Sequence, residues 1–302
     1  MTIYQQSSSS NKPLFDAFKA RFPDITLTTV DLIGPALIAR LDAESMSGGP
    51  QAELVMNSQP DQLGLSNGGH LIPYTPPTAT NLPEAFIGRD GEWRAYLMTI
   101  GGIYYNTNRV KAADAPTSYA DLVDPKWKGR LATGSLRTAS GTSQAFTAML
   151  RDKVITPEWI QALADSKIFI SPSVSAAIQV VTSGQADVGL DIPYYYFLAS
   201  KAQGAPIEFV FPKEGVTSIS LAISKLKGAK NALAGDLYFS WMFSPQAQSI
   251  LAEMGVQSTM PGSPPSSSIP KGREVAFHPI DWKTLVEIYP KQLATFQAIF
   301  PN

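Results

Sequence analysis

The order of apolar and polar positions along the chain predicts an α/β fold. Residues 2–6 and 25–30 read as strands, and the apolar residues of the segment between them recur at helical spacing. A second helix is predicted over residues 37–44 and a third strand over residues 52–57. This strand–helix–strand–helix–strand opening is typical of a mixed, mainly parallel sheet flanked by helices.

Two extended apolar runs, residues 96–106 and 216–224, divide the chain. The first is too long for one ordinary strand, and each run could leave one sheet and enter another. The alternation of strands and helices restarts between them, and a single closing helix is predicted over residues 281–300. We therefore predict two lobes with a ligand cleft between them. The predicted boundaries are residues 1–103 for the first lobe, 104–218 for an inserted second lobe, and 219–302 for the return to the first lobe with the C-terminal helices.

Composition excludes several classes of function. The chain has 302 residues, 24 Lys and Arg against 25 Asp and Glu, two His and no Cys. A net charge of −1 provides no field to hold nucleic acid, and thiol nucleophiles and Cys-based metal sites are impossible. No phosphate-binding Walker loop, G-x-S-x-G or H-E-x-x-H motif occurs, so nothing in these residues calls for catalysis. We predict a monomer with no cofactor and no resident metal.

The start of the sequence bears on localisation. No apolar run is long enough for a membrane helix, and the first residues lack the basic and apolar regions of a signal peptide. The chain enters a predicted strand at once, as a mature exported protein would after removal of its leader. The sequence is therefore compatible with an exported protein whose leader was replaced by Met1.

One serine- and threonine-rich segment precedes a predicted helix. It contains Ser140, Gly141 and Thr142, with Arg137 beside it. Free N–H groups at the start of a helix, two hydroxyls and a glycine that permits close approach make an oxyanion site. An ordinary helix cap explains most such segments, and that alternative stays open here.

Other polar side chains follow predicted strands. Ligands of open α/β sheets bind beyond the carboxyl ends of the strands, which makes such positions candidates. Helix capping or packing is the alternative for each of them. The remaining predicted ligand-binding residues are Ser8, Ser58, Ser173, Asp191, Tyr194 and Tyr195.

Three segments resemble one family of transport proteins. They are the block DLVDPKWKGRL at residues 121–131, GQADVG at residues 184–189 and FPKEG at residues 211–215. The first block is similar to one found in ferric-ion-type solute-binding proteins of ABC importers. The resemblance implies a type II periplasmic binding fold with two hinge strands and a location in the periplasm. It also implies a protein that is not an enzyme and delivers its ligand to an ABC permease in the inner membrane.

The resemblance also bears on the ligand. Tyr194 and Tyr195 match the tyrosine pair that binds ferric ion in the iron members, but Ser8 and Ser58 stand where one iron subgroup has a His and a Glu. The loop around Ser140 matches the loop with which family members grip an anion. The implied ligand is a small phosphonate or phosphorylated organic anion, with 2-aminoethylphosphonate favoured if Asp191 faces its ammonium group. The alternative is ferric ion bound by the tyrosine pair.

Overall fold

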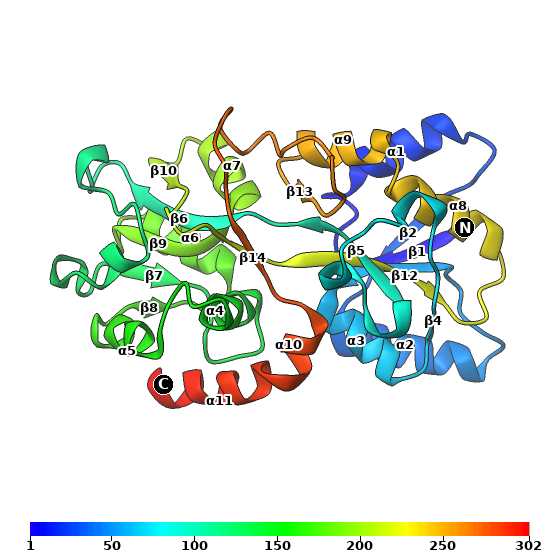
Figure 1. The fold of residues 1–302 in the computed structure, drawn as a ribbon, viewed down its shortest axis with the longest axis horizontal. Coiled ribbons are helices and arrows are strands. Elements are labelled where there is room, and N and C mark those ends of the chain that lie inside the picture. The colour runs from blue at the N-terminus through cyan, green and yellow to red at the C-terminus, as the bar shows by residue number, and fades with distance from the viewer. Residues whose placement is uncertain (302) are drawn as a thin grey trace. The chain divides into compact units, whose positions relative to one another are not determined.

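The computed structural model describes residues 1–301 and divides into two compact units. Unit 1 comprises Met1–Met98 and Ser220–Ile269, and unit 2 comprises Thr99–Ile219 and residues 270–301. Each unit contains one sheet flanked by helices, which confirms the α/β prediction (Figure 1). Residues 270–301 pack with unit 2, whereas the sequence assigned the whole of 219–302 to the first lobe and to the C-terminal helices.

The sheet of unit 1 has the strand order β13-β5-β12-β3-β1-β2, with β4 paired to β12. Strand β1 is parallel to β2 and β3, whereas β12 is antiparallel to β3 and β5. Its strands are β1 (Thr2–Gln5), β2 (Thr28–Asp31), β3 (Leu54–Ser58), β4 (Leu71–Ile72), β5 (Trp93–Met98), β12 (Ser220–Leu226) and β13 (Gln257–Ser258).

The helices of unit 1 cover this sheet through their apolar faces. Phe18 lies 4.8 Å from Tyr238 and 5.3 Å from Trp241 between ring centroids, both edge-to-face. Such contacts join the first helix to a helix more than 200 residues later, so the return segment completes the core of unit 1. The helices are α1 (Lys12–Arg21), α2 (Gly34–Met46), α3 (Gln59–Asn67), α8 (Ala232–Met242) and α9 (Pro245–Glu253), with 3₁₀ turns at Pro77–Ala79, Glu84–Phe86 and Arg89–Gly91.

The sheet of unit 2 has the order β14-β11-β6-β9-β7-β8, with β10 paired to β6. Strand β7 is parallel to β8 and β9, whereas β6 is antiparallel to β9 and β11. Its strands are β6 (Gly101–Asn106), β7 (Leu131–Thr133), β8 (Phe169–Ile170), β9 (Val188–Pro193), β10 (Ile207–Val210), β11 (Val216–Ser218) and β14 (Phe277–Pro279).

The C-terminal segment forms two helices of unit 2 rather than the single helix predicted over 281–300. The interruption lies at Ile288, because Pro290 has no N–H to donate to the carbonyl four residues earlier. The second of these helices lies beside α4 (Figure 1) and buries Phe296 in the core of unit 2. The helices are α4 (Gly141–Arg151), α5 (Pro157–Asp165), α6 (Val174–Thr182), α7 (Tyr194–Ala202), α10 (Trp282–Glu287) and α11 (Tyr289–Ile299), with 3₁₀ turns at Ala112–Asp114, Ala120–Val123 and Pro125–Trp127.

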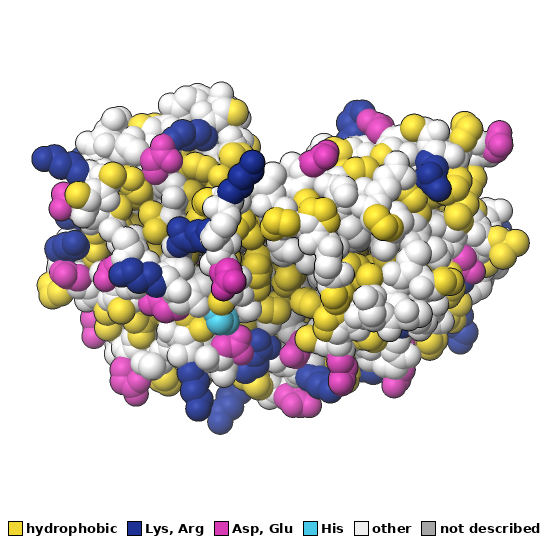
Figure 2. Space-filling model, turned by 45° about the horizontal axis from the view of Figure 1, so that its top comes forward, with side chains coloured by type: hydrophobic (Ala, Val, Ile, Leu, Met, Phe, Trp, Pro, Cys, Tyr) yellow, Lys and Arg dark blue, Asp and Glu magenta, His cyan; other side chains and the backbone are white. Residues whose placement is uncertain are grey.

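Both predicted extended runs pass from one sheet to the other. Strand β5 ends at Met98 in the sheet of unit 1 and β6 begins at Gly101 in that of unit 2. The return run leaves the second sheet at Ser218 and enters the first at Ser220. None of the helices within residues 1–301 has the length and apolar character needed to cross a bilayer. On the face shown in Figure 2, basic and acidic side chains are interspersed over each unit.

Candidate functional site

The candidate site of unit 2 lies at the edge of its sheet where three parallel strands end. Strands β7, β8 and β9 run in the same direction, so the segments that follow them emerge together. A side chain at Gly134, just after β7, would meet both the Thr142 hydroxyl (2.4 Å) and Val174 (3.2 Å). The loop after β7 therefore touches the starts of α4 and α6 at this edge, where ligands of open α/β sheets bind.

Ser140 has the capping role that was the alternative interpretation of this segment. Its hydroxyl accepts from the backbone N–H of Ser143 (3.2 Å), and the Ser143 hydroxyl accepts from the backbone N–H of Ser140 (3.1 Å). The Ser143 hydroxyl is also 2.8 Å from the phenolic oxygen of Tyr289. These bonds fix the loop and the first turn of α4 in one geometry.

The donors left over at the start of α4 are the N–H groups of Gly141 and Thr142. Neither has an acceptor within residues 1–301, whereas those of the two following residues are bonded to Ser140. The side chain of Thr142 is 1% exposed, and its hydroxyl makes no hydrogen bond of normal geometry within the described chain. The two free backbone N–H groups are suited to an oxyanion, and the Thr142 hydroxyl, which also lowers the pKa of Asp191 by hydrogen bonding, lies beside them.

Two other predicted residues near this edge have structural partners. The Arg137 guanidinium donates through Nε to the carbonyl oxygen of Phe300 (3.0 Å), which holds it against the C-terminal segment of unit 2. Ser173 caps α6 by accepting from the N–H of Ala176 (3.1 Å). Their predicted part in ligand binding stays a prediction.

Asp191 places a buried carboxyl group at the same edge. Its backbone has φ of 56°, the left-handed region that residues other than glycine rarely adopt, and its carboxylate accepts from the Thr217 hydroxyl (2.5 Å). Burial raises the pKa of Asp191 to about 6, although the hydroxyls of Thr217 and Thr142 act in the opposite direction. The site therefore contains an acidic group that titrates close to neutral pH.

Gly101 and Thr217 belong to this site, and neither was predicted from the sequence. Gly101 lies on β6 between its partners on β11 and β9. A Cβ at Gly101 would lie 2.1 Å from the Thr217 hydroxyl and 3.0 Å from the Asp191 carboxylate. Only glycine leaves room for that hydrogen bond, and the one sequence signal for it is the Gly101-Gly102 pair within an otherwise apolar run.

The three consecutive tyrosines differ in their surroundings. The ring of Tyr194 packs among Phe197, Phe209 and Phe211, with centroids 4.9–6.0 Å apart. Tyr195 is 38% exposed, and the centroid of its ring lies 4.5 Å from that of Tyr196, with the two rings tilted by 36°. Burial, the Tyr196 ring and the Asp191 carboxyl all raise the pKa of Tyr195. The rings that adjoin are those of Tyr195 and Tyr196, and the predicted part of Tyr194 and Tyr195 in ligand binding stays a prediction.

Ser8 and Ser58 share an edge of the other sheet, in unit 1. They follow β1 and β3, which are parallel. The Ser8 hydroxyl donates to the carboxylate of Asp31 (3.0 Å). Burial raises the pKa of Asp61, and the hydrogen bond from the Ser58 hydroxyl to its carboxylate opposes this rise. Because a hydroxyl group has one hydrogen, the hydroxyl oxygens of Ser8 and Ser58 can accept a hydrogen bond from a ligand but have no hydrogen left to donate to one.

The oxygen ligands that could hold a cation at the edge of unit 2 are Asp191, Tyr195 and Tyr196. Within residues 1–301, no group of three or more His, Cys, Asp or Glu side chains is placed to hold a metal ion. The edge therefore combines a donor cluster for an anion with one carboxyl group and phenolic oxygens.

Comparison with known proteins identifies relatives. A sequence model of bacterial extracellular solute-binding proteins matches residues 59–287. Iron uptake protein A1 of Synechocystis sp. is 29% identical over 191 residues, which cover 58% of this chain and 51% of that protein. The chain thus spans about half the length of the first curated relatives that it matches.

Solved structures share the fold at low identity. Iron-bound HitA from Pseudomonas aeruginosa superposes with a TM-score of 0.79 at 19% identity, covering 99% of this chain and 98% of that one. The periplasmic binding protein AfuA from Actinobacillus pleuropneumoniae, with exogenous fructose-6-phosphate bound, gives 0.73 at 20% identity, covering 99% and 98%. These similarities confirm the predicted type II periplasmic binding fold.

Proposed function

Because the chain belongs to the bacterial extracellular solute-binding proteins, we propose that it is the periplasmic component of an ABC importer and captures a small organic phosphonate or phosphate ester. The observation that carries this proposal is the donor cluster of Gly141 and Thr142 at the start of α4. Membership of a family of solute-binding proteins supports binding without turnover, followed by delivery to a membrane permease.

The chemistry of the donor cluster favours an oxyanion. Two backbone N–H groups, with the Thr142 hydroxyl beside them, lie at the positive end of a helix and point out of it. Hydrogen bonds to a charged acceptor are roughly twice as strong as those between neutral groups. Because the capping bonds of Ser140 and Ser143 hold these donors in place without a ligand, little ordering remains to be done when the anion binds.

The Asp191 carboxyl group narrows the choice of ligand. With a pKa of about 6 it is mainly ionised at neutral pH, and an isolated anion beside it would be repelled. A zwitterion avoids this cost because its ammonium group neutralises the carboxylate. 2-Aminoethylphosphonate has both charges, so it is the ligand that we propose to test first.

The experiment compares two substitutions at one residue by titration calorimetry. Thr142→Val removes the buried hydroxyl at nearly constant volume, and Thr142→Ser retains it. We expect Thr142→Val to weaken 2-aminoethylphosphonate binding by about 1–3 kcal/mol, or roughly 5- to 150-fold, and Thr142→Ser to bind within a few-fold of the parent protein. Equal affinities for both variants would move the anion site away from α4.

A ferric-ion carrier is the second candidate. Tyr195 lies beside Tyr196 and near Asp191, and both Iron uptake protein A1 and HitA are named or solved as iron proteins. Against it, the raised pKa of Tyr195 disfavours the phenolate that ferric ion binds. Loading with ferric citrate followed by visible absorbance tests this candidate, because tyrosinate bound to iron is coloured. Colour that disappears in Tyr195→Phe but persists in Tyr194→Phe would establish iron as the cargo.

A further inference from the structure

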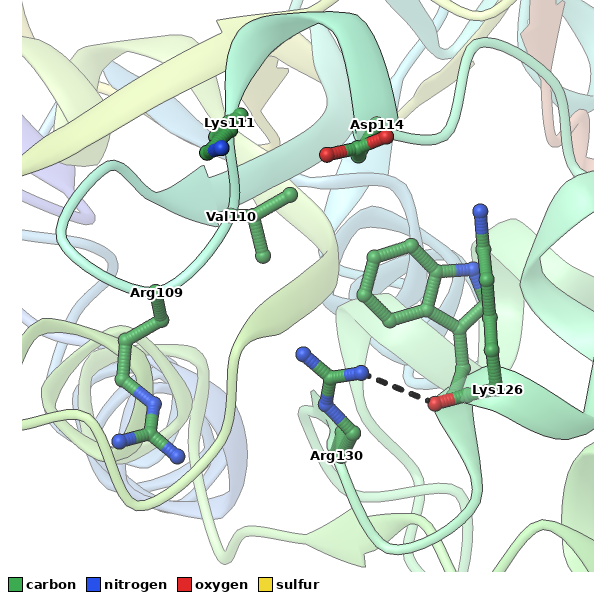
Figure 3. Close-up of a pocket in the computed structure, with 7 residues that line it drawn as sticks. Arg109, Val110, Lys111, Asp114, Lys126 and Arg130 are labelled. Atoms are coloured by element: carbon green, nitrogen blue, oxygen red, sulfur yellow. Dashed lines mark hydrogen bonds between the residues drawn. The ribbon is translucent and has the colours of Figure 1, made fainter.

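A second pocket in unit 2 is built around one buried carboxylate that holds two arginines. Asp187 is 2% exposed, and its Oδ1 accepts from Nε of Arg109 (2.5 Å) while its Oδ2 accepts from Nε of Arg130. The terminal nitrogen Nη1 of Arg130 also donates to the carbonyl of Lys126 (3.1 Å), drawn as a dashed line in Figure 3. Both guanidinium groups are therefore fixed in position.

Positive charge is in excess in this pocket. Its volume is about 290 Å³, and its basic lining residues are Arg109, Lys111, Lys126 and Arg130. One lining carboxylate, Asp114, and the buried Asp187 oppose these four, which leaves two positive charges unbalanced. In a chain of net charge −1, such a local excess contrasts with the interspersed charges of Figure 2.

Several donors of the pocket have no protein acceptor. Both terminal nitrogens of Arg109 and Nη2 of Arg130 make no hydrogen bond to any residue between 1 and 301. The guanidinium group of Arg130 is further held over the ring of Trp127, 5.1 Å from its centroid, and Figure 3 shows it directed toward Val110. These are planar donor forks with free N–H groups, which match the oxygens of a tetrahedral oxyanion.

This pocket is separate from the site of the proposed function. Arg109 follows the end of β6, Arg130 precedes β7 and Asp187 precedes β9. Since β6 is antiparallel to β9 and β7 is parallel to it, all three residues lie at the edge where β7 and β9 begin. Gly141, Thr142 and Asp191 lie at the opposite edge of the same sheet, where these strands end.

We propose that this basic pocket binds a phosphate group carrying two negative charges. Two arginine forks fixed by Asp187 contact its oxygens, and Lys111 and Lys126 balance the remaining charge. The phosphate is supplied either by a free phosphate compound or by a phospholipid whose headgroup is a phosphomonoester, as in phosphatidic acid, two sources with the same recognition chemistry.

The first test is titration of the ¹⁵N-labelled protein with inorganic phosphate at low ionic strength, with chloride as the matched salt. Amide signals of residues 109–114 and 126–130 should shift, whether or not those of Gly141 and Thr142 also respond. Shifts confined to the start of α4, or no shift beyond that caused by chloride, would overturn the proposal. The readout is specific to the position in the sheet, so it separates this pocket from the proposed importer site.

Charge variants supply the second test. The double variant Lys111→Gln/Lys126→Gln changes two exposed side chains of the pocket and leaves Arg109, Arg130 and Asp187 intact. We expect it to bind phosphate about tenfold or more weakly at the pocket. The control Lys153→Gln/Lys291→Gln makes the same change of net charge at exposed residues of unit 2 that do not line the pocket, and it should leave the affinity unchanged.

A third variant predicts a change in the opposite direction. Asp114→Asn removes the one carboxylate among the lining residues and should tighten phosphate binding by about two- to fivefold. If Lys111→Gln/Lys126→Gln and the control Lys153→Gln/Lys291→Gln weaken phosphate binding equally, the cause is a general charge effect and the proposal is overturned.

Vesicles distinguish the two sources of phosphate. Cosedimentation with phosphatidic acid vesicles but not with phosphatidylcholine vesicles, lost in Lys111→Gln/Lys126→Gln, assigns the pocket to a lipid headgroup. Shifts with inorganic phosphate in the absence of cosedimentation assign it to a free phosphate compound.

Discussion

Replacement of Gly141 by proline removes one backbone donor from the predicted anion site without disturbing α4. Gly141 is the first residue of the helix, a position where proline is favoured because its missing N–H has no partner within the helix. The residue before a proline must be extended, and Ser140 already is, with φ of −139° and ψ of 165°. A Cβ at Gly141 meets only Ile219, at an ordinary 3.7 Å.

The magnitude follows from the bond that is lost. A hydrogen bond to a charged acceptor contributes about 1.5–3 kcal/mol, so Gly141→Pro should bind 2-aminoethylphosphonate roughly 10- to 150-fold more weakly. Gly141→Ala adds the same Cβ and keeps the N–H, which makes it the matched control, and its affinity should stay near that of the parent protein. Neither variant should lower the free energy of unfolding, because proline and alanine are both better than glycine at this position.

Calorimetric titration of the parent protein, Gly141→Pro and Gly141→Ala, with urea unfolding of each, tests this prediction. Weaker binding in Gly141→Pro alone, at unchanged stability, supports the site at the start of α4. If Gly141→Pro and Gly141→Ala bind equally well, the N–H of residue 141 does not contact the ligand and the reasoning from unpaired donors is refuted. If both variants bind equally poorly, steric exclusion by the Cβ is responsible instead.

Other parts of the site give further predictions. The folded protein keeps a proton on Asp191 that the unfolded chain releases between pH 3.8 and about 6, so the free energy of unfolding falls as pH rises through this interval. Asp191→Asn should abolish that slope and be more stable by up to roughly 3 kcal/mol at pH 7, as measured by urea unfolding at pH 4 and pH 7; identical pH profiles would contradict the assigned pKa. Gly101→Ala should destabilise the protein by about 1–3 kcal/mol because its Cβ overlaps the Thr217 hydroxyl, and Thr217→Ala in the same chain should restore part of the loss. If the melting temperature falls no further in Gly101→Ala than in the double variant, the strands move apart freely and the predicted overlap with the Thr217 hydroxyl does not occur.

The elements that could be predicted from the sequence are those formed by contacts between residues close together in the chain. The start of α4 follows from a Ser–Gly–Thr segment and its capping box, and both extended runs were visible as apolar stretches. These features depend on backbone geometry and helix capping, which neighbouring residues control.

The features that were missed depend on pairing between distant residues. Thr217 lies within an apolar run and meets Asp191 only because β11 and β9 flank β6. Three consecutive tyrosines at the start of a helix point about 100° apart, so their order alone does not tell which two adjoin. The parts proposed for Ser8, Ser58, Ser173 and Arg137 likewise stay predictions.

The order in which the chain is synthesised has a consequence for the loop before α4. Ser143 contacts Tyr289, 146 residues later, and Arg137 contacts Phe300, 163 residues later. During synthesis the loop therefore lacks both contacts until nearly all of residues 1–301 have been made, whereas the return segment Ser220–Ile269 completes unit 1 earlier. We therefore expect unit 1 to reach its folded state before unit 2 does.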